Sequence, residues 1–259
     1  CFVYGKTEKN RIVTREVITP ETMQSGAVFF DIDSVWNSRL RRSWLFPVLK
    51  SRGVKIVTQL YDLIPVQHPQ YCHENTVLSF MVYIGANIGY ADLIITSAKA
   101  TVKQLDILTD RLGTERKKAA VVPLGCDFNA KHDSKPCKAV SDAVNAGRYI
   151  LMVGTIEPRK NHKLVLDALD SGLGMNVIFA GRIGWNVAEL EQRIRKHSLN
   201  GKNLFFFDNA GDDDIDYLYK NAFAVAFPTY NEGFGLPVIE AFQHNTPVFA
   251  SDIEVLHEV

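Results

Sequence analysis

Short, continuously apolar runs alternate with amphipathic segments from about Gly147 to the end of the chain. The apolar runs are RYILMVG, NVIFAG, LFFFD, AVAFPTY and PVFAS, and the segments between them are NHKLVLDALDSG, VAELEQRIRKHS, DIDYLYKNA and LPVIEAFQHN. A strand that is apolar along its whole length must be covered on both faces, so the alternation predicts a parallel sheet with helices on each side. We therefore expect a doubly wound α/β domain over residues 148–259.

The first half of the chain shows the same alternation in a less complete form. The expected strands are AVFFDID, VKIVTQLYD, DLIITSA and KAAVVPLG, and the expected helices are SRLRRSWLFPVLKSRG, VLSFMVYIGANIGYA and KATVKQLDILTDRLG. This predicts a second Rossmann-like domain over residues 1–126. The polar, turn-rich stretch that follows predicts a linker at residues 127–147. Two such domains would face a cleft, and open α/β sheets bind ligands at the carboxyl ends of their strands.

The charge balance and the cysteines limit the class of partner and the compartment. The 259 residues carry 29 lysines and arginines against 29 aspartates and glutamates, which argues against a nucleic-acid partner because such proteins carry a basic excess. No run approaches the roughly 20 apolar residues of a membrane span, and none has the pattern of a signal peptide. The four cysteines, Cys1, Cys72, Cys126 and Cys137, have no CxxC spacing. We interpret them as free thiols of a cytoplasmic protein.

The stretch VGTIEPRKN combines a strand end, two cations and a helix start. A predicted strand ends at Gly154, and Arg159 and Lys160 precede a helix whose expected cap is Asn161. Positive side chains beside a helix N-terminus, with its free N–H groups and positive dipole end, favour an anion such as phosphate. The alternative is that both cations are solvated surface charges.

The stretch EGFGLPVIE places Glu232 and Glu240 on either side of a glycine turn. Pro237 suits the first turn of a helix, and the glycines allow a ligand to approach the amides of residues 234–236. A carboxylate can accept two adjacent sugar hydroxyls, so one acid could hold a hexose ring and the other a ribose. The plainer alternatives are a turn residue for Glu232 and compensation of the helix dipole for Glu240.

Together, GTIEPRKN, AGRIGW and DDDIDYLYKNAFAVAFPTYNEGFGLPVIEAFQHNTPVFASD resemble the carboxyl-terminal domain of the retaining glycosyltransferases of family four. The motif that carries the resemblance is Glu-x7-Glu, here Glu232 to Glu240. The resemblance is close over Tyr149–Val259 and weaker over FFDIDSVWN, YDLIPVQHP, DLIITSAKAT and VVPLGCD, which are similar to the acceptor-side domain of bacterial polysaccharide members. It implies the GT-B fold, an α/β fold of two Rossmann-like domains that face a cleft. We expect both domains to be incomplete, because CFVYGKTEKN offers no glycine-rich loop and the last helices of the second domain do not follow.

The resemblance implies how the two acids would divide a sugar-nucleotide donor between them. Glu232 would contact the donor sugar, and Glu240 would bind the nucleotide ribose. The backbone of the turn between them would contact both the sugar and the diphosphate. The residues of that turn are Phe234, Gly235 and Leu236.

The resemblance also implies that phosphate binding rests on Arg159 and Lys160, which would neutralise the donor diphosphate. Members of the family often carry an arginine directly after the glycine that ends the strand, and this chain has Thr155 in that donor-binding position. Two cations beside a helix terminus can stabilise the departing diphosphate, so we expect neither a metal nor any other cofactor. The DID at Asp31–Asp33 matches a metal-binding pattern but lies in the acceptor half, so we discount it.

Retention of the anomeric configuration follows from the resemblance as well, and no residue stands out as a covalent nucleophile. The usual proposal for the family is a same-face attack, with the diphosphate taking the acceptor proton. Members often have a histidine before the aspartate of the DLIP segment, where this chain has Tyr61. A neutral tyrosine cannot play the same acid–base part near pH 7. Asp62 is expected near the donor sugar, and Glu232 and Asp62 are the two candidate catalytic residues.

The resemblance predicts a hexosyltransferase acting on a saccharide or lipid-linked saccharide acceptor in cell-surface polysaccharide synthesis. GTIEPRKN and YDLIP are similar to segments of bacterial surface-polysaccharide enzymes, many of which use GDP-mannose, so mannose is the expected sugar. Two alternatives stay open: a non-catalytic sugar-nucleotide-binding module and a GT-B sugar-nucleotide epimerase. An NAD enzyme is disfavoured because no G-x-G-x-x-G follows a strand.

The segment WNSRLRRSWLFPVLKSR joins aromatic residues to basic ones and contains no acid. A basic helix with aromatic residues can lie on an anionic membrane, which is where a lipid-linked acceptor would be found. The pattern favours the simpler arrangement, a helix with an apolar face in the core and a solvated basic face. Peripheral contact with the inner face of the plasma membrane is the alternative.

Overall fold

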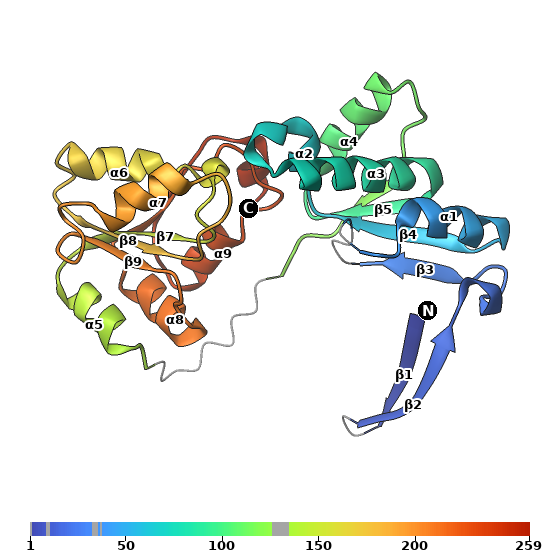
Figure 1. The fold of residues 1–259 in the computed structure, drawn as a ribbon, viewed down its shortest axis with the longest axis horizontal. Helices are drawn as coiled ribbons and strands as arrows, with labels where there is room; N and C mark the ends of the chain where they lie inside the picture. The colour runs from blue at the N-terminus through green and yellow to red at the C-terminus, as the bar shows by residue number, and fades with distance from the viewer. Residues whose placement is uncertain (1, 9–10, 33–35, 37, 126–134) are drawn as a thin grey trace. The chain divides into compact units, whose positions relative to one another are not determined.

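The computed structural model describes the chain apart from residues 1, 9–10, 33–35, 37 and 126–134, and it divides into two compact units (Figure 1). The first unit comprises residues 1–66, 74–97 and 101–122, and the second comprises residues 67–73, 98–100 and 123–259. Each unit has its own parallel sheet, so each is described by itself. None of the helices in the described residues is long and apolar enough to cross a membrane.

The first unit is built on a four-stranded parallel sheet in the order β3-β4-β5-β6. Its strands are β3 (Val28–Asp31), β4 (Lys55–Leu60), β5 (Leu93–Thr96) and β6 (Ala119–Val121). Helices α1 (Arg42–Ser51), α2 (Ile64–Gln67), α3 (Glu74–Tyr90) and α4 (Lys99–Arg111) lie between the strands in the chain. Short apolar strands that alternate with helices are confirmed here, and α1 packs against β4 through the fully buried Phe46, Leu49 and Ile56.

A hairpin precedes this sheet in the chain. Strand β1 (Phe2–Glu8) pairs antiparallel with β2 (Arg11–Ile18), with a register shift between Lys6 and Thr7. This hairpin has no clear signal in the sequence, because FVYGKTE interrupts the apolar pattern with a glycine and charged residues.

The second unit is built on a five-stranded parallel sheet in the order β11-β10-β7-β8-β9. Its strands are β7 (Tyr149–Val153), β8 (Asn176–Ala180), β9 (Leu204–Phe207), β10 (Ala224–Phe227) and β11 (Val248–Ala250). The first three run outward from β7 in chain order, and β10 then returns to the other side of β7. The chain therefore reverses direction across the sheet between β7 and β10, which is the position where open α/β sheets bind ligands.

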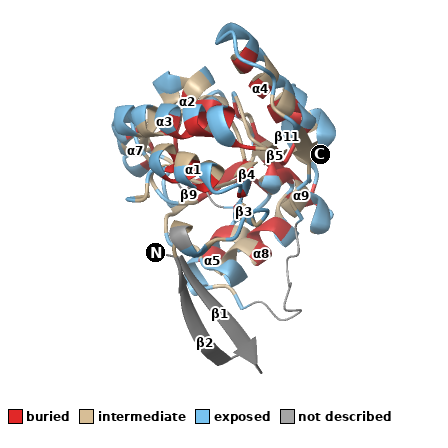
Figure 2. Cartoon of the chain, turned by 90° about the vertical axis from the view of Figure 1, so that its right-hand side faces the viewer, coloured by how far each residue is buried: buried red, intermediate tan, exposed pale blue. Residues whose placement is uncertain are grey.

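Two layers of helices cover the second sheet, as the alternation predicted. Alternate residues of β7 and β8 point to opposite faces, so Leu151 and Ile178 pack with α5 (Lys138–Asn145), α8 (Asp212–Asn221) and α9 (Leu236–Gln243). Met152 and Phe179 pack on the other face with α6 (His162–Asp170) and α7 (Ala188–Arg195). In Figure 2 the helices are red where they are buried and pale blue on the outside.

Helix α5 corrects the expected linker at residues 127–147. Val140 and Ala143 of α5 are fully buried in the core of the second unit, so this part of the stretch belongs to the domain. The polar sequence was misleading because the helix is short and buries only one narrow face. Residues 126–134 lie outside the described chain, and the thiols of Cys72 and Cys137 form no disulfide within it.

The ends of β7 and β8 approach each other closely at Gly181. A side-chain carbon at Gly181 would lie 2.0 Å from the carbonyl oxygen of Gly154, and the φ of Gly181 is +155°. Only glycine fits such an approach. The backbone pairing continues past the strands, since Gly184 donates to the carbonyl of Ile156 at 2.9 Å. This brings the segments that follow β7 and β8 together at the carboxyl edge of the sheet.

Candidate functional site

Two loops meet at the carboxyl edge of the second sheet because β7 and β10 are hydrogen-bonded neighbours. The loop after β7 contains Thr155 and the 3-10 turn Pro158–Lys160, and the loop after β10 leads to α9. The amide of Tyr230 donates to the carbonyl of Arg159 at 2.9 Å, and the Thr229 hydroxyl donates to the same carbonyl at 3.2 Å. The two predicted motifs, far apart in the sequence, therefore form one site.

The centre of this site is the carboxylate of Glu232. Its Oε1 lies 2.7 Å from Lys160 Nζ and 2.7 Å from an Arg159 guanidinium nitrogen. The Glu232 side chain is only 10% exposed. Burial alone would raise the pKa of Glu232, but the charges of Lys160 and Arg159 and their hydrogen bonds outweigh it and hold that pKa below its ordinary value. Glu232 is therefore an ionised, partly desolvated acceptor.

Arg159 faces carboxylates rather than open solvent. Besides Glu232, its guanidinium pairs with the buried Glu157 and donates to the carbonyl of Asn231. Burial alone would lower the pKa of Arg159, but the two carboxylates raise it. The sequence predicts that Arg159 and Lys160 bind a phosphate together, whereas the structure gives the Arg159 guanidinium three partners inside the protein.

Lys160 lies differently. Its Nζ contacts Glu232 and sits 4.9 Å from the centre of the Phe227 ring, over the end of β10. Its Cε passes 4.0 Å from where a side-chain carbon at Gly154 would be. The Lys160 side chain therefore passes close to Gly154, the glycine that follows β7, where the resemblance implies a diphosphate. Asn161 is the N-cap residue of α6, with φ +58°, but its side chain makes no capping hydrogen bond.

The glycine turn presents backbone rather than side chains. Phe234 is buried against Val255, so only its main chain can face a ligand. Gly235 has φ +116°, and a side-chain carbon there would lie 2.6 Å from Leu256 Cδ2. Leu236 then begins α9, with Pro237 in its first turn. The first-turn amides of a helix have no acceptor inside the helix, so this turn offers N–H donors and a positive dipole end to an anion.

Glu240 lies in the second turn of α9 and is held by a residue that the sequence analysis missed. The hydroxyl of Tyr219 donates to Glu240 Oε2 at 2.6 Å, while Glu240 Oε1 has no partner in the part of the chain that the structure describes. Tyr219 is fully buried and stacks on His244, with ring centres 5.2 Å apart. No local signal could have found this contact, because Tyr219 and Glu240 come from different helices.

Asp62 and Tyr61 lie in the first unit, after β4. Asp62 Oδ1 accepts a hydrogen bond from the Ile64 amide at 2.9 Å, at the start of α2, and the Tyr61 hydroxyl donates to the Ile32 carbonyl at 3.0 Å. Asp31, part of the discounted DID, forms a buried ion pair with Arg42 at 2.7 Å. Asp33 lies outside the described residues. Whether Asp62 acts on a donor sugar stays a prediction.

A comparison with known protein families finds a match over the part of the chain that contains both motifs. Residues 136–259 match the family described as glycosyl transferases group 1. The chain is 29% identical over 252 residues to the serotype-specific mannosyltransferase WbdA of Escherichia coli, and this match covers 90% of the chain and 31% of WbdA. It is 26% identical to the O-antigen chain mannosyltransferase B of Escherichia coli, over 82% of the chain and 56% of that protein.

Solved structures confirm the fold. The crystal structure of HepE from Anabaena in complex with UDP and glucose superposes with a TM-score of 0.66 at 18% identity, over 88% of the chain and 60% of HepE. Such a likeness identifies the GT-B fold. The chain spans about a third of the length of the first curated relatives that it matches.

Proposed function

Because residues 136–259 match the family described as glycosyl transferases group 1, we propose that the whole protein is a retaining hexosyltransferase that moves mannose from GDP-mannose. Its acceptor is a saccharide or lipid-linked saccharide in cell-surface polysaccharide synthesis, on the cytoplasmic side of the membrane. Two relatives named as mannosyltransferases, one of them for O-antigen chains, support this choice of sugar and pathway class.

The observation that carries the proposal is the cluster of Lys160, Arg159 and Glu232 beside the N-terminus of α9. It lies at the carboxyl edge of the sheet, after the paired strands β7 and β10. A desolvated carboxylate can accept hydroxyl groups of a sugar, and an adjacent ammonium and helix terminus can hold a diphosphate. One site thus offers complementary groups for both parts of a sugar nucleotide.

In the free protein the Lys160 ammonium forms an ion pair with Glu232. In the proposed reaction this ammonium leaves Glu232 and pairs with the donor diphosphate. Glu232 keeps its ion pair with Arg159 and accepts hydroxyls of the donor sugar. Lys160 and the amides of Phe234, Gly235 and Leu236 stabilise the negative charge that develops as the diphosphate leaves, so no metal is needed. Arg159 adds positive charge and holds Glu232 in place.

Glu240 binds the ribose in this proposal. Its Oε1 accepts a ribose hydroxyl while Oε2 stays on Tyr219. Asp62 contacts the donor sugar, a role that rests on the resemblance of YDLIP alone. The acceptor attacks on the face from which the diphosphate leaves, and the diphosphate takes its proton.

We propose further that the first unit touches a membrane surface. Helix α1 exposes Trp44 by 71% and Val48 by 40%, although it buries Leu45, Phe46 and Leu49. Helix α3, which packs against α1, exposes three more apolar side chains, Leu78, Met81 and Val82. Exposed Arg41 and Arg52 flank α1. Exposed apolar side chains on two packed helices, with basic residues at both ends of one of them, suit anionic lipid, and we refer to these side chains as the apolar patch.

Sedimentation with vesicles tests the membrane contact. We expect the protein to pellet with vesicles rich in anionic lipid and to remain in solution with neutral ones. Trp44→Ser should abolish pelleting, and Leu112→Ser, at another exposed leucine, should leave it unchanged. Equal pelleting of both variants would contradict the proposed patch.

A transfer assay tests the reaction. The protein is incubated with GDP-mannose and an α-mannan oligosaccharide, and products are detected by mass spectrometry. We expect an acceptor longer by one hexose, with an α linkage by NMR because GDP-mannose is an α donor. A β linkage would contradict retention. GDP binding without product would favour the non-catalytic binding module instead.

A further inference from the structure

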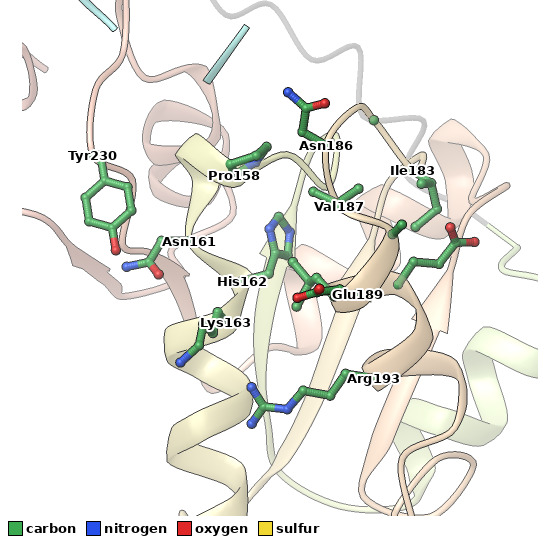
Figure 3. Close-up of a pocket in the computed structure, with 14 residues that line it drawn as sticks. Pro158, Asn161, His162, Lys163, Ile183, Asn186, Val187, Glu189, Arg193 and Tyr230 are labelled. Atoms are coloured by element: carbon green, nitrogen blue, oxygen red, sulfur yellow. The ribbon is translucent and has the colours of Figure 1, made fainter. Parts of the chain in front are cut away.

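The second unit contains a pocket of about 850 Å³ that the proposed donor chemistry does not use. It opens between the start of α6 and the segment that leads from β8 into α7 (Figure 3). Thr155, Arg159, Lys160, Glu232 and Glu240 are not among the described residues that line it. Its volume falls within the ~300–1,000 Å³ that is usual for ligand sites.

The base of the pocket is a buried histidine with an unused nitrogen. His162 is 1% exposed, and its Nδ1 has no hydrogen-bond partner among the described residues. Figure 3 shows the imidazole in the middle of the lining residues. The ring packs edge-on against Phe179, with ring centres 5.1 Å apart. Burial, with a smaller contribution from the nearby Lys160 charge, lowers the pKa of His162 to about 3, so the ring is neutral near pH 7. A neutral imidazole donates one hydrogen bond and accepts another, as a hydroxyl group requires.

Further unused polar groups line the same pocket. The side-chain amides of Asn161 and Asn186 and the carboxylate of Glu189 make no hydrogen bond or ion pair within the described residues. Tyr230 stands at the rim, 53% exposed, with one side of its ring stacked on Tyr71. Pro158, Ile183 and Val187 add apolar surface.

The charges of the pocket argue against an anionic ligand. Its two cations are engaged, since Lys163 pairs with Asp167 at 2.6 Å and Arg193 pairs with both Asp167 and Asp170. Glu189 would repel a phosphate or a carboxylate. A purely apolar ligand would leave the amides and His162 Nδ1 unpaired, which is costly in a buried site. A neutral ligand rich in hydroxyl groups satisfies both conditions, because hydroxyls can donate to Glu189 and both donate to and accept from the amides and the imidazole.

We propose that this pocket is a saccharide-binding subsite that holds sugar residues of the acceptor chain behind its growing end. The binding of a saccharide rests on the pocket alone, and the acceptor role rests on the proposed function. The loops that carry Lys160 and Glu232 also supply Pro158, Asn161 and Tyr230 to the pocket wall, so a bound chain would lie next to the donor cluster. The hydroxyl groups of the saccharide form hydrogen bonds with His162, the two asparagine amides and Glu189. The Tyr230 ring packs on one face of a sugar ring.

Binding of neutral oligosaccharides without nucleotide tests the subsite. Saturation-transfer NMR and calorimetry are run with linear oligosaccharides of mannose, glucose and rhamnose. Ala188→Trp fills the pocket from an exposed position in the first turn of α7, so it leaves the core unchanged. Glu189→Gln removes the negative charge of the Glu189 carboxylate, which is a hydrogen-bond acceptor in the pocket, and keeps the shape of the side chain. Ala139→Trp, at an exposed alanine in the first turn of α5, is the matched control.

We expect at least one oligosaccharide to bind, with loss of detectable binding in Ala188→Trp and at least threefold weakening in Glu189→Gln. Ala139→Trp should bind as the unchanged protein does. GDP binding without any saccharide binding would overturn the subsite and leave the donor proposal standing. Saccharide binding without nucleotide binding would support the subsite and contradict the donor proposal. Undiminished binding in Ala188→Trp would also overturn the subsite.

Discussion

The ammonium of Lys160 lies 2.7 Å from the carboxylate of Glu232, although 72 positions separate the two residues in the chain. The pairing of β7 with β10 brings them together, and Arg159 completes the cluster. The two cations differ in their number of partners. Arg159 donates to three acceptors, whereas Lys160 pairs with one carboxylate. Lys160 can therefore leave Glu232 paired with Arg159, whereas loss of Arg159 would leave the buried Glu157 without its ion pair.

The first prediction separates these two cations by stability. Arg159→Met would leave Glu157 and Glu232 partly buried without their shared partner, and breaking such a buried pair costs about 3–5 kcal/mol. Lys160→Met should lower the free energy of unfolding by only about 1–2 kcal/mol, because Glu232 keeps Arg159. Urea unfolding of both variants measures the difference. Equal losses would show that Arg159 has no special structural role.

The second prediction concerns acid. The pKa of Glu232 is lowered in the folded protein, below its ordinary value of 4.5. A lowered folded pKa stabilises the protein above the ordinary pKa, and this stability is lost as the pH falls through the folded pKa. Glu232→Gln should therefore lower the free energy of unfolding near pH 7. Below pH ~4.5 the free energy of unfolding of this variant should decline less steeply than that of the unchanged protein. Denaturant unfolding from pH 7 to pH 3 checks this. Parallel curves for both proteins would contradict the assigned pKa shift.

The third prediction concerns the ribose. Tyr219→Phe removes the hydrogen bond to Glu240 Oε2 and should leave the carboxylate less well oriented. A hydrogen bond to a charged group contributes roughly 1.5–3 kcal/mol, so GDP affinity should fall about tenfold. The preference for GDP over 2′,3′-dideoxy-GDP should shrink as well. Tyr149→Phe is the control, because its buried hydroxyl bonds the Leu218 carbonyl instead. A shrinking preference in the control would indicate a general structural effect.

The fourth prediction concerns the joined ends of β7 and β8. Gly181→Ala would place a carbon 2.0 Å from the Gly154 carbonyl oxygen and must push the two backbones apart. We expect a loss of more than ~2 kcal/mol in the free energy of unfolding. Gly211→Ala is the matched control, because the nearest atom to its new carbon is 3.9 Å away. Thermal unfolding measures both variants. A loss of stability in Gly181→Ala as small as that in Gly211→Ala would show that the two backbones can move apart at little cost.

The two motifs and most strands and helices of the second unit could be predicted because each is encoded locally. Apolar runs mark β7 to β11, and glycine, proline and acid mark the turn before α9. That Lys160 and Glu232 lie at one donor site was implied by the family resemblance, and their parallel strands agree with it because such sheets bind ligands at the carboxyl edge.

Other features depend on contacts that no local pattern encodes. Helix α5 looked like linker because its buried face is narrow, and Tyr219 meets Glu240 only through the packing of α8 on α9. The three partners of Arg159 were equally hidden, because Asn231 and Glu232 lie on another loop. No sequence pattern singles out His162, and its unused Nδ1 is apparent only in the pocket.

Calorimetric titration with GDP and GDP-mannose tests the central claim, a sugar-nucleotide site on Lys160, Glu232 and Glu240, most directly. The protein, Lys160→Ala and the control Lys163→Ala are compared at one salt concentration. Lys163 is an exposed lysine that pairs with Asp167 in α6. We predict that both ligands bind the unchanged protein and Lys163→Ala equally, and bind Lys160→Ala at least tenfold more weakly. Equal affinity in Lys160→Ala would contradict the account.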